Sequence, residues 1–570
     1  MTNAEIAAIF DEMADILDFQ GANTFRVRAY RNASRTVKDL GESLAQMRAA
    51  GGKFMDIDGI GKDLAEKITT LLEAGQLQQH QELRAAVPAK VLLMLRIPGL
   101  GPRKAAVLYK ELGITTLEML REACHERRVR DLKGFGAKTE DTILKGLAFV
   151  ETEEDRIYWS EADIYAQELL QHMRGCMAVR QVEVAGSYRR GKETIGDLDV
   201  LVDGNDSELV MDHLGIFPGV DDVLARGETK MSIRLASGIQ VDLRVVPEES
   251  FGAALQYFTG SKEHNVILRS RAKARGLKIN EWGVFRDDKY LGGRTEEEIY
   301  DAMNLPCMPP ELREARREFD WADMDDIPEL IELRDIRGDL HMHTTETDGK
   351  ATLEEMVAAA KEKGHEYIAI TDHSKRVTMA NGLDGPRLIK QWEQIDKLNQ
   401  ELTGITVLKG VEVDILEKGG LDLEDEILAQ ADWVVASIHF GQNQSRAQIT
   451  QRIVDALANP HVCAIAHPTG RLINRRKAYE VDLDAVYQAA SEHGKMLELN
   501  ANPARLDLND VACMTTKDHD IPIVISTDAH STERLNGMRY GVLQARRAGL
   551  TRYDVANTRT WNQLQRMLGR

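Results

Sequence analysis

The sequence predicts a multidomain protein with an all-α region first, a mixed α+β region next, and a parallel α/β region at the C-terminal end. Three observations lead to this fold class. In the first 150 residues apolar positions recur at three- and four-residue steps, as in amphipathic helices. Short β-rich runs then follow a helical segment between residues 180 and 246. From residue 337 onward apolar strands alternate with helices, which is typical of a parallel sheet.

The amino-acid composition limits the classes of protein to which this chain can belong. The 570 residues suffice for three or four domains of about 100–200 residues each. A chain with 43% apolar and 29% charged residues is neither wholly disordered nor a coiled-coil rod. No run approaches the roughly 18 uncharged apolar residues of a membrane span, and the acidic, helix-patterned start is not expected to act as a secretory signal. The five cysteines lack a CxxC pair. We therefore expect a cytoplasmic protein with no membrane partner.

Three GxG turns separate helical segments in the first region. The net charge of −19 argues by itself against a nucleic-acid partner, but residues 86–150 hold 12 Lys and Arg against 7 Asp and Glu. Each turn taken singly is typical of an ordinary helix–helix connection. Three of them, with Lys104 directly after one, favour helix-hairpin-helix motifs whose backbone N–H groups bind DNA phosphates. The candidate DNA-binding glycines are Gly59, Gly61, Gly99, Gly101, Gly134 and Gly136.

Three aspartates lie on two predicted strands of the mixed region. Side chains alternate along a strand, so Asp197 and Asp199 share one face while Leu198 and Val200 face the core. Asp242 lies in the middle of a second apolar strand, where an uncompensated charge is costly. An isolated DxD is usually a solvated turn. With a glycine-serine turn upstream and the third acid, the pattern favours a site for divalent cations and phosphates.

Histidines concentrate in the last region, where ten of the fifteen follow residue 335. A lone histidine is more often structural than a ligand, but here the placement is systematic. Parallel barrels carry their chemistry at the carboxyl ends of the strands, so these groups are predicted to gather at one mouth. The seven apolar strand candidates that end in metal-type side chains are 336–343, 367–373, 407–412, 433–439, 462–467, 496–500 and 523–530.

Residues 1–318 resemble a family X DNA polymerase, the group that performs short gap-filling synthesis, and the run GSYRRGKETIGDLDVLV at 186–202 carries the resemblance. It implies that Asp197 and Asp199 bind two Mg²⁺ or Mn²⁺ ions. It also implies that Asp242 binds the ion that activates the primer 3′-hydroxyl. The nucleotide contacts that the resemblance implies are Ser187, Arg190 and Gly196 at the triphosphate, Tyr257, Phe258 and Gly260 in the sugar-facing segment, and Asn265 and Arg269 at the base pair or template.

The first helices resemble the small lyase domain of the same family. Lys67 falls at the position of the Schiff-base lysine of members that remove 5′-deoxyribose phosphate. Its neighbours Asp63 and Glu66 are acidic, which favours an ordinary surface lysine because a reactive lysine needs a depressed pKa. Lyase activity stays open at this point.

Residues 337–570 resemble a polymerase-and-histidinol-phosphatase (PHP) domain, a seven-stranded barrel phosphoesterase. The mixture of imidazole and carboxylate ligands suits up to three Zn²⁺ or Mn²⁺ ions. The implied activity is a 3′→5′ exonuclease, with cleavage at abasic sites and 3′-end cleaning as alternatives. Motif by motif, the implied metal ligands are His341, His343, Asp348, His373, Glu412, His439, His467, Asp528 and His530.

As a whole the sequence resembles the bacterial and archaeal family X enzymes. The expected fold class is therefore N-terminal helix-hairpin-helix domains, an α+β nucleotidyltransferase palm with a thumb, and a C-terminal (β/α)7 PHP barrel. The expected divisions are a lyase-like domain at 1–85, a fingers-like domain at 86–150, the palm at 151–260, the thumb at 261–318, a linker at 319–336 and the barrel at 337–570.

The expected partners are gapped or primer-template DNA and deoxynucleoside triphosphates (dNTPs), with the protein a monomer associated with the nucleoid. Two other functions remain as alternatives. One is a template-independent nucleotidyltransferase, because the GS…DxD pattern serves many substrates. The other is a DNA-binding scaffold whose barrel is a small-molecule phosphatase.

Overall fold

A computed structural model describes the chain in two compact units, one formed by residues 1–154 with 375–382 and the other by residues 155–374 with 383–570. Among the described residues, no helix is both long and apolar enough to cross a membrane. The described residues are 3–39, 44–49, 52–57, 60–74, 76–87, 91, 94, 97, 100–137, 139–144, 147 and 156–569.

The first unit is helical, as the apolar spacing predicts. In α4, Leu64, Ile68 and Leu71 are buried at three- and four-residue steps and join a core with Phe10 of α1. A second core gathers around α7 and α8. The helices are α1 (Asn3–Phe19), α2 (Thr24–Asp39), α3 (Leu44–Ala49), α4 (Lys62–Ala74), α5 (Gln78–Ala85), α7 (Pro102–Leu112) and α8 (Leu117–His125).

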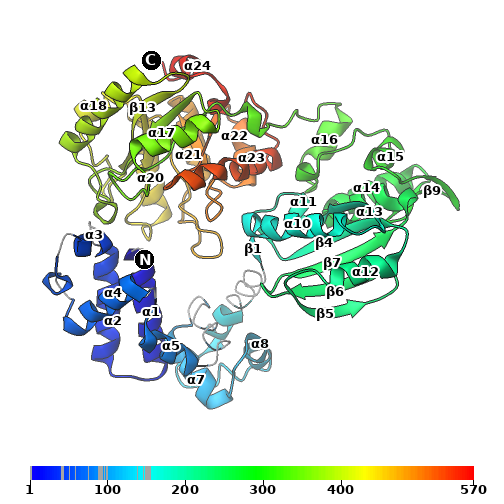
Figure 1. Ribbon diagram of the computed structural model, residues 1–570, viewed down its shortest axis with the longest axis horizontal. Helices are drawn as coiled ribbons and strands as arrows, with labels where there is room; N and C mark the ends of the chain where they lie inside the picture. Colours follow the sequence, from blue (N-terminus) through cyan, green and yellow to red (C-terminus); the bar gives the residue numbers. More distant parts are fainter. Residues whose placement is uncertain are drawn as a thin grey trace. The chain divides into compact units, whose positions relative to one another are not determined.

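The second unit begins with a five-stranded sheet of order β2-β4-β7-β6-β5 (Figure 1). Its two central strands, β4 and β7, are parallel, and the other neighbours are antiparallel. Helices α10 and α12 cover one face with an apolar core. The elements are β1 (Ile157–Tyr158), α10 (Trp159–Arg174), β2 (Val179–Val184), α11 (Gly186–Arg189), β3 (Thr194–Ile195), β4 (Asp197–Gly204), α12 (Ser207–Gly215), β5 (Val220–Arg226), β6 (Lys230–Leu235), β7 (Gln240–Val246) and α13 (Phe251–Thr259).

A small region of helices and a three-stranded sheet follows the five-stranded sheet. It has its own core, which includes Leu268, Tyr300 and Phe319. The segment expected as a linker contains α16, and Arg316 and Arg317 just before it form ion pairs with Asp510 (3.1 Å) and Asp518 (2.6 Å). The elements are α14 (Lys262–Ala274), β8 (Lys278–Asn280), β9 (Gly283–Arg286), β10 (Lys289–Gly292), α15 (Glu296–Asp301) and α16 (Glu318–Asp323).

Seven parallel strands follow in the order β11 to β17, and a bridge between Met342 and Ala529 joins the ends of the first and last strands. The His343 N–H also donates to the Ala529 carbonyl at 2.9 Å, so the sheet closes into a barrel. This confirms the predicted (β/α)7 fold. The strands are β11 (Gly338–Asp339), β12 (Tyr367–Ile370), β13 (Thr406–Asp414), β14 (Trp433–Ser437), β15 (Ala464–Ile465), β16 (Met496–Asn500) and β17 (Ile523–Ser526).

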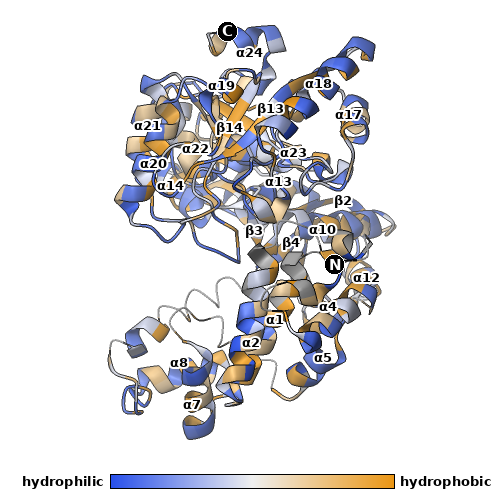
Figure 2. Ribbon diagram, turned by 90° about the vertical axis from the view of Figure 1, so that its left-hand side faces the viewer, coloured by the Kyte–Doolittle hydropathy of each residue, from blue (hydrophilic) through white to orange (hydrophobic). Residues whose placement is uncertain are grey.

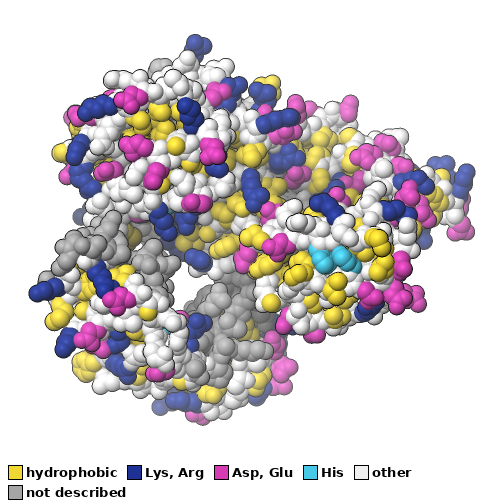
Figure 3. All heavy atoms as spheres, in the orientation of Figure 1, with side chains coloured by type: hydrophobic (Ala, Val, Ile, Leu, Met, Phe, Trp, Pro, Cys, Tyr) yellow, Lys and Arg dark blue, Asp and Glu magenta, His cyan; other side chains and the backbone are white. Residues whose placement is uncertain are grey.

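Helices surround the barrel strands, which are buried on both sides. In Figure 2 the strand β14 is strongly hydrophobic, as expected for a parallel strand covered on both faces, whereas β13 also carries Lys409, Glu412 and Asp414. On the face that Figure 3 shows, acidic and basic side chains are intermixed. The helices are α17 (Leu353–Glu362), α18 (Gly385–Glu401), α19 (Asp425–Leu428), α20 (Arg446–Ala458), α21 (Leu483–Glu492), α22 (Asp510–Lys517), α23 (Met538–Arg547) and α24 (Trp561–Met567).

Candidate active sites and metal centre

The three aspartates of the mixed region meet at the centre of the five-stranded sheet. In the β4–β7 ladder Asp199 lies directly opposite Asp242, and Asp197 lies two residues before Asp199 on the same face. Leu198 and Val200 are buried beneath them, as the alternation predicts. Asp242 accepts hydrogen bonds from the hydroxyl of Ser232 and from Gln240 at 3.2 Å. The fold therefore brings the three carboxylates to one site.

The charges at this site oppose one another. Burial raises the pKa of Asp199 to about 7, and the neighbouring charges of Asp197 and Asp242 add to the rise. This carboxyl therefore keeps its proton to a higher pH than an ordinary aspartate. A divalent cation would take the place of that proton and relieve the repulsion.

The turn before β4 contains the residues that the sequence predicts as phosphate contacts. Gly186 has a φ of +63° and packs so closely against Asp199 that a Cβ atom would clash with its carboxylate. Ser187 and Arg190 line one cavity of about 420 Å³, and Gly196 directly precedes β4. The Arg190 Nε donates to Glu314 at 3.0 Å, and its guanidinium also donates to the Thr259 carbonyl.

The sugar-facing and template-facing residues are held as a group. Asn265 of α14 donates to the Tyr257 carbonyl at 2.8 Å and accepts from Gln256 at 2.8 Å, which ties α14 to the end of α13. The Arg244 guanidinium lies 4.5 Å from the ring centroid of Phe258. Gly260 ends α13 with a φ of +70°, and the Arg269 Nε donates to the Asn265 carbonyl at 3.2 Å.

The GxG turns are described in part, because Gly59 and Gly99 lie outside the described residues. Gly61, Gly101 and Gly136 each accept the first backbone hydrogen bond of the following helical segment, at 2.9–3.0 Å. A Cβ atom at any of these three, or at Gly134, would meet nothing within 4 Å, so the backbone is open to a ligand there. The Lys104 Nζ lies 5.8 Å from the ring centroid of Phe135.

The barrel mouth gathers all nine predicted ligands. Eight of them form three groups whose ligand atoms lie within 4.8 Å of one another. His467 completes the set, since its Nε2 lies 3.0 Å from Glu412. The groups are His343, Asp348, His373 and His530; then His341, His343 and Asp528; then His373, Glu412 and His439.

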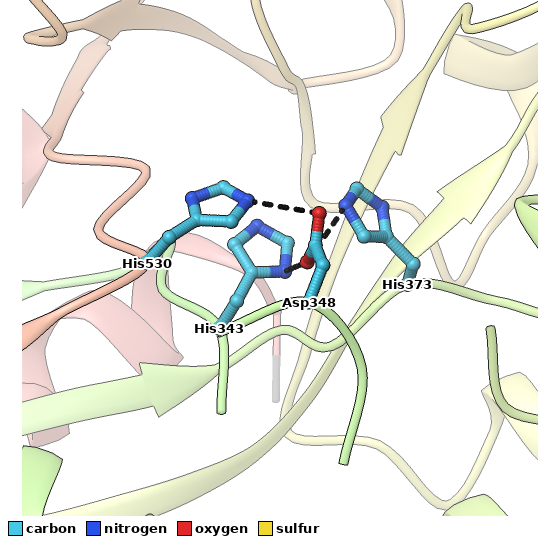
Figure 4. A group of neighbouring side chains, drawn as sticks. All are labelled: His343, Asp348, His373 and His530. Atoms are coloured by element: carbon cyan, nitrogen blue, oxygen red, sulfur yellow. Dashed lines mark ion pairs between the residues drawn. The ribbon is translucent and has the colours of Figure 1, made fainter. Parts of the chain in front are cut away.

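Shared residues place the three groups side by side. Figure 4 shows Asp348 between three imidazoles: Oδ2 lies 3.3 Å from His530 Nε2, and Oδ1 lies 3.6 Å from His373 Nε2 and 3.9 Å from His343 Nδ1. Glu412 Oε2 lies 2.8 Å from His373 Nδ1 and 3.4 Å from His341 Nε2. This geometry fits a cluster of neighbouring ions bridged by carboxylates.

Several buried acids behind the ligands orient them. Glu498 accepts from His341 Nδ1 at 2.7 Å and from the His467 N–H at 2.6 Å, which turns His341 Nε2 toward the mouth. Asp414 lies 3.1 Å from His439 Nδ1. The sequence did not assign these acids a role, although each lies on or just after a strand candidate that ends in metal-type side chains. Such partners fix the tautomer of a metal-bound histidine.

The electrostatics of the mouth suit metal ions. Burial would raise the pKa of Glu412, but His373, His439 and His341 hold it well below the usual range. Burial, with His530 and His373 adding to it, lowers the pKa of His343 to about 3, so its ring is neutral at pH 7. A neutral imidazole and an ionised carboxylate are the forms that bind metal. Burial would lower the pKa of His341 and of His373, but the neighbouring acids hold both well above the usual range, so an ion at these rings would displace a proton.

Ring nitrogens without a hydrogen bond show whether the residues of the barrel mouth fit metal ions. Among the described residues, the buried atoms His341 Nε2, His343 Nδ1 and Nε2, His373 Nδ1 and His467 Nδ1 have no hydrogen-bond partner. Buried polar atoms without partners are rare in proteins unless an ion or water satisfies them. The residues present therefore fit the metal ions that the sequence predicts.

Comparison with known proteins finds relatives of the whole chain and of its separate parts. A curated relative, the DNA polymerase/3′-5′ exonuclease PolX of Bacillus subtilis (strain 168), is 40% identical over 100% of both chains. The chain belongs to the family X DNA polymerases. Matching family models are a helix-hairpin-helix domain at 1–77, a SAM-like helix-hairpin-helix tandem at 91–148, the DNA polymerase beta palm at 156–234, the DNA polymerase beta thumb at 254–314 and a PHP domain at 339–502.

Two further relatives of this family X polymerase match separate parts of it. DNA polymerase lambda of Rattus norvegicus is 26% identical over 55% of this chain and 56% of its own. A probable phosphatase of Thermoanaerobacter sp. (strain X514) is 29% identical over 39% of this chain and 89% of its own. The predicted fold class and the predicted family resemblance are both confirmed.

Proposed function

We propose that this family X polymerase fills short gaps in DNA, as part of DNA repair, with two Mg²⁺ or Mn²⁺ ions at the palm. Asp197 and Asp199 hold both ions, and Asp242 holds the one nearest the primer 3′-hydroxyl. When bound, the ions activate that hydroxyl and neutralise the charge on the triphosphate. The observation that carries the proposal is the pairing of Asp199 with Asp242 across β4 and β7, beside a cavity lined by cationic side chains.

The remaining palm and thumb residues bind the nucleotide. Ser187 and Arg190 line the cavity and take the triphosphate, with Gly196 at the edge of the site. Tyr257, Phe258 and Gly260 face the deoxyribose. Asn265 and Arg269 reach the base pair or template from α14, and the bond from Asn265 to the Tyr257 carbonyl keeps the two sets in register.

The barrel hydrolyses phosphodiesters as a 3′→5′ exonuclease, with Zn²⁺ or Mn²⁺ in up to three places. The ions supply a Lewis acid and an activated nucleophile. The chain's part is to hold them: Asp348 and Glu412 would bind ions together with the surrounding imidazoles, and Glu498 and Asp414 orient the imidazoles. The exonuclease in the printed name of the Bacillus subtilis relative supports this reaction.

A paired substitution experiment tests the two sites. Asp197→Ala combined with Asp199→Ala should abolish dNTP incorporation on a gapped duplex and spare Mn²⁺-dependent digestion of end-labelled DNA. His341→Ala should do the reverse, because the sites share no ligand. Loss of both activities by one variant with an unchanged melting temperature would contradict two independent sites.

A second function for the barrel is favoured by its phosphatase relatives, which match 39% of the chain. If the barrel is a small-molecule phosphatase, it will hydrolyse free phosphate monoesters and leave DNA 3′ ends intact. Digestion of DNA ends supports the exonuclease instead. Parallel assays on DNA with an ordinary 3′ end, with a 3′-phosphate and with an abasic site show which of these three substrates the barrel cleaves. Incorporation on gapped duplex and on single strands distinguishes templated from template-independent transfer.

The helix-hairpin-helix turns bind phosphates of gapped or primer-template DNA through their open glycine backbones, with Lys104 beside one turn. The proposal also includes the expected domain divisions, a monomeric state and a cytoplasmic, nucleoid-associated location. Light scattering of the free protein tests the monomer. Lys67 is only 13% exposed at its side chain, but it forms an ion pair with Asp63, which favours a charged lysine over a reactive one. Borohydride trapping of a cross-link that Lys67→Ala abolishes would reverse that assignment.

A further inference from the structure

A cavity of about 420 Å³ lies at the turn whose first residue, Gly186, packs against Asp199, and it is built from two domains. Its palm wall contains Ser187, Arg190 and Lys192, and its other wall contains Gln544 and Arg547 of the barrel helix α23. Both α23 residues are buried, at 1% and 3% exposure. Neither belongs to the metal mouth of the barrel. The nucleotidyltransferase fold alone thus does not complete the cavity in which the triphosphate is proposed to bind.

The barrel helix holds the backbone of the phosphate-binding turn. Arg547 Nη1 donates to the Arg190 carbonyl at 2.5 Å, and Gln544 Nε2 donates to the next carbonyl, that of Gly191, at 2.9 Å. Gly191 has a φ of +67°, and a Cβ atom there would lie 2.6 Å from Leu543 Cδ1. Three contacts from about one turn of α23 thus fix the end of the segment that begins at Ser187.

The same helix also orients the side chain of Arg190. Arg547 Nη1 lies 3.0 Å from Glu314 Oε1, and Arg190 Nε donates to that same oxygen at 3.0 Å. Arg547 Nη2 is balanced by Asp510 at 2.7 Å. Burial would raise the pKa of Glu314, but Arg547, Arg190 and Lys192 hold it below the usual range, so it is ionised. Removing Arg547 would leave Glu314 paired with Arg190 and, at 3.9 Å, with Lys192.

The charge balance of the cavity indicates its ligand. Its lining includes Arg156, Arg190, Lys192 and Arg547, against Glu193 and Asp510. Glu193 is already paired with Arg471 at 2.6 Å, and Asp510 is paired with Arg316 and Arg547. Arg190, Lys192 and Arg547 share the Glu314 carboxylate, and Arg547 shares Asp510 with Arg316, so four cations face two acids beside Ser187. A chain of phosphates is the anion that neutralises several such cations at once.

We propose that Arg547, with Gln544, is a positioning residue of the polymerase site, so that the PHP barrel forms one wall of the dNTP triphosphate pocket. The proposal rests on the assignment of Ser187 and Arg190 to the triphosphate. It gives the barrel a second role, independent of hydrolysis: α23 fixes the turn and the guanidinium that receive the incoming nucleotide. Because this contact is made before chemistry, its loss weakens nucleotide binding more than turnover.

The test compares Arg547→Leu, Gln544→Leu and Arg547→Lys with a matched control, Arg546→Leu. Arg546 is the neighbouring arginine of α23 and pairs across the same interface with Glu311 at 2.7 Å, but it does not contact the turn. Single-nucleotide gap filling is measured as a function of dNTP concentration. Inhibition by inorganic tripolyphosphate gives a second readout of the pocket, and digestion of end-labelled DNA reports that the barrel is folded.

We expect KM for dNTP to rise about tenfold in Arg547→Leu and about threefold in Gln544→Leu, with kcat within roughly twofold of the parent. The inhibition constant of tripolyphosphate should rise in parallel. Arg547→Lys should recover part of the loss, since it keeps a charge beside Glu314. Arg546→Leu should leave both constants and digestion unchanged.

An unchanged KM in Arg547→Leu with normal digestion overturns the proposal, as does an equal rise in Arg546→Leu. If Arg547→Leu does not fold, an unchanged KM in both Gln544→Leu and Arg547→Lys overturns it. Arg190→Ala separates this failure from failure of the proposed function. If Arg190→Ala leaves KM for dNTP unchanged, the triphosphate assignment itself is wrong. If it raises KM while the α23 variants do not, only the role of the barrel wall is wrong.

Discussion

The two candidate metal sites of this chain differ in how much of the coordination the protein supplies. At the palm, three aspartates from two strands meet, and Asp197 is exposed to solvent. At the barrel mouth, nine ligands come from the ends of several strands, and most of their side chains are buried. Buried acids such as Glu498 and Asp414 then orient the imidazoles. The palm has no comparable set of buried orienting acids among its described residues.

This difference indicates two kinds of metal binding. Three carboxylates leave most positions around a Mg²⁺ ion to water and substrate phosphates, so the palm ions should arrive with the nucleotide. The barrel mouth offers imidazole and carboxylate for nearly every position and has buried nitrogens without partners, so its ions should stay bound between turnovers. Each prediction below tests one side of this contrast.

The largest effect should come from Glu412→Gln. Glu412 lies within 3.6 Å of five imidazoles, so replacing its charge with an amide removes the bridge between neighbouring ions. We expect DNA digestion to fall roughly a thousandfold, with dNTP incorporation unchanged. Elemental analysis after gel filtration should show fewer ions per chain than in the parent.

The control for that experiment is Glu426→Gln, which removes the same charge from an exposed position on α19. It should keep the full complement of ions. A Glu412→Gln protein that retained all its ions and its digestion rate would show that the mouth does not bind metal as a bridged cluster.

A smaller loss is expected from Glu498→Gln, which leaves every ligand in place. The amide would present a donor where Glu498 now accepts from His341 Nδ1 and from the His467 N–H. Loss of such an orienting partner typically costs about 10–100-fold in metal affinity or activity. The measurements are the Mn²⁺ concentration for half-maximal digestion and the rate at saturation.

Glu366→Gln serves as the matched control, since Glu366 pairs with Arg337 on an exposed surface at 2.6 Å. It should change neither value. Equal behaviour of the two variants would mean that the buried acid does not hold His341 in place.

The sequence predicted these two sites unequally well. Alternation on a strand was enough to place Asp197 and Asp199 on one face. The strand-end pattern predicted that metal-type side chains gather at one mouth, and the family resemblance supplied the individual ligands, with Asp348 among them. Nothing local distinguishes Arg547 from other arginines, because its role depends on a distant partner. Glu498 lies on a strand candidate that ends in metal-type side chains, but the pattern does not separate an orienting acid from a ligand. The side chains of the edge strand β5 are mostly exposed, so no apolar alternation marks that strand.

The palm should bind Mg²⁺ in a pH-dependent manner. Because the pKa of Asp199 is about 7 without a cation, binding must displace a proton at lower pH. The affinity for Mg²⁺ should therefore fall about tenfold per pH unit below 7 and be constant above it. Calorimetry with Mg²⁺ and a nonhydrolysable dNTP analogue on gapped DNA measures this without turnover.

Asp197→Asn provides the internal check, because removing a neighbouring negative charge lowers the pKa of Asp199. The pH midpoint of Mg²⁺ binding should therefore be lower in this variant, even though its affinity for Mg²⁺ at high pH is weaker than that of the parent. An affinity independent of pH from 6 to 8 in the parent would show that the three carboxylates do not share a proton.

The smallest effect should come from Ser232→Ala at the palm. Ser232 lies opposite Asp242 in the β6–β7 ladder and donates to its carboxylate, but Asp242 also accepts from Gln240 and lies 3.7 Å from Lys230 Nζ. Loss of one hydrogen bond of about 1 kcal/mol should lower kcat/KM for incorporation roughly fivefold. Ser232→Thr, which keeps the hydroxyl, should recover the parent rate, and digestion should not change in either. A loss as large as that of Glu498→Gln would mean that the palm carboxylates, like the barrel imidazoles, depend on a preset geometry, and the contrast between the two sites would no longer hold.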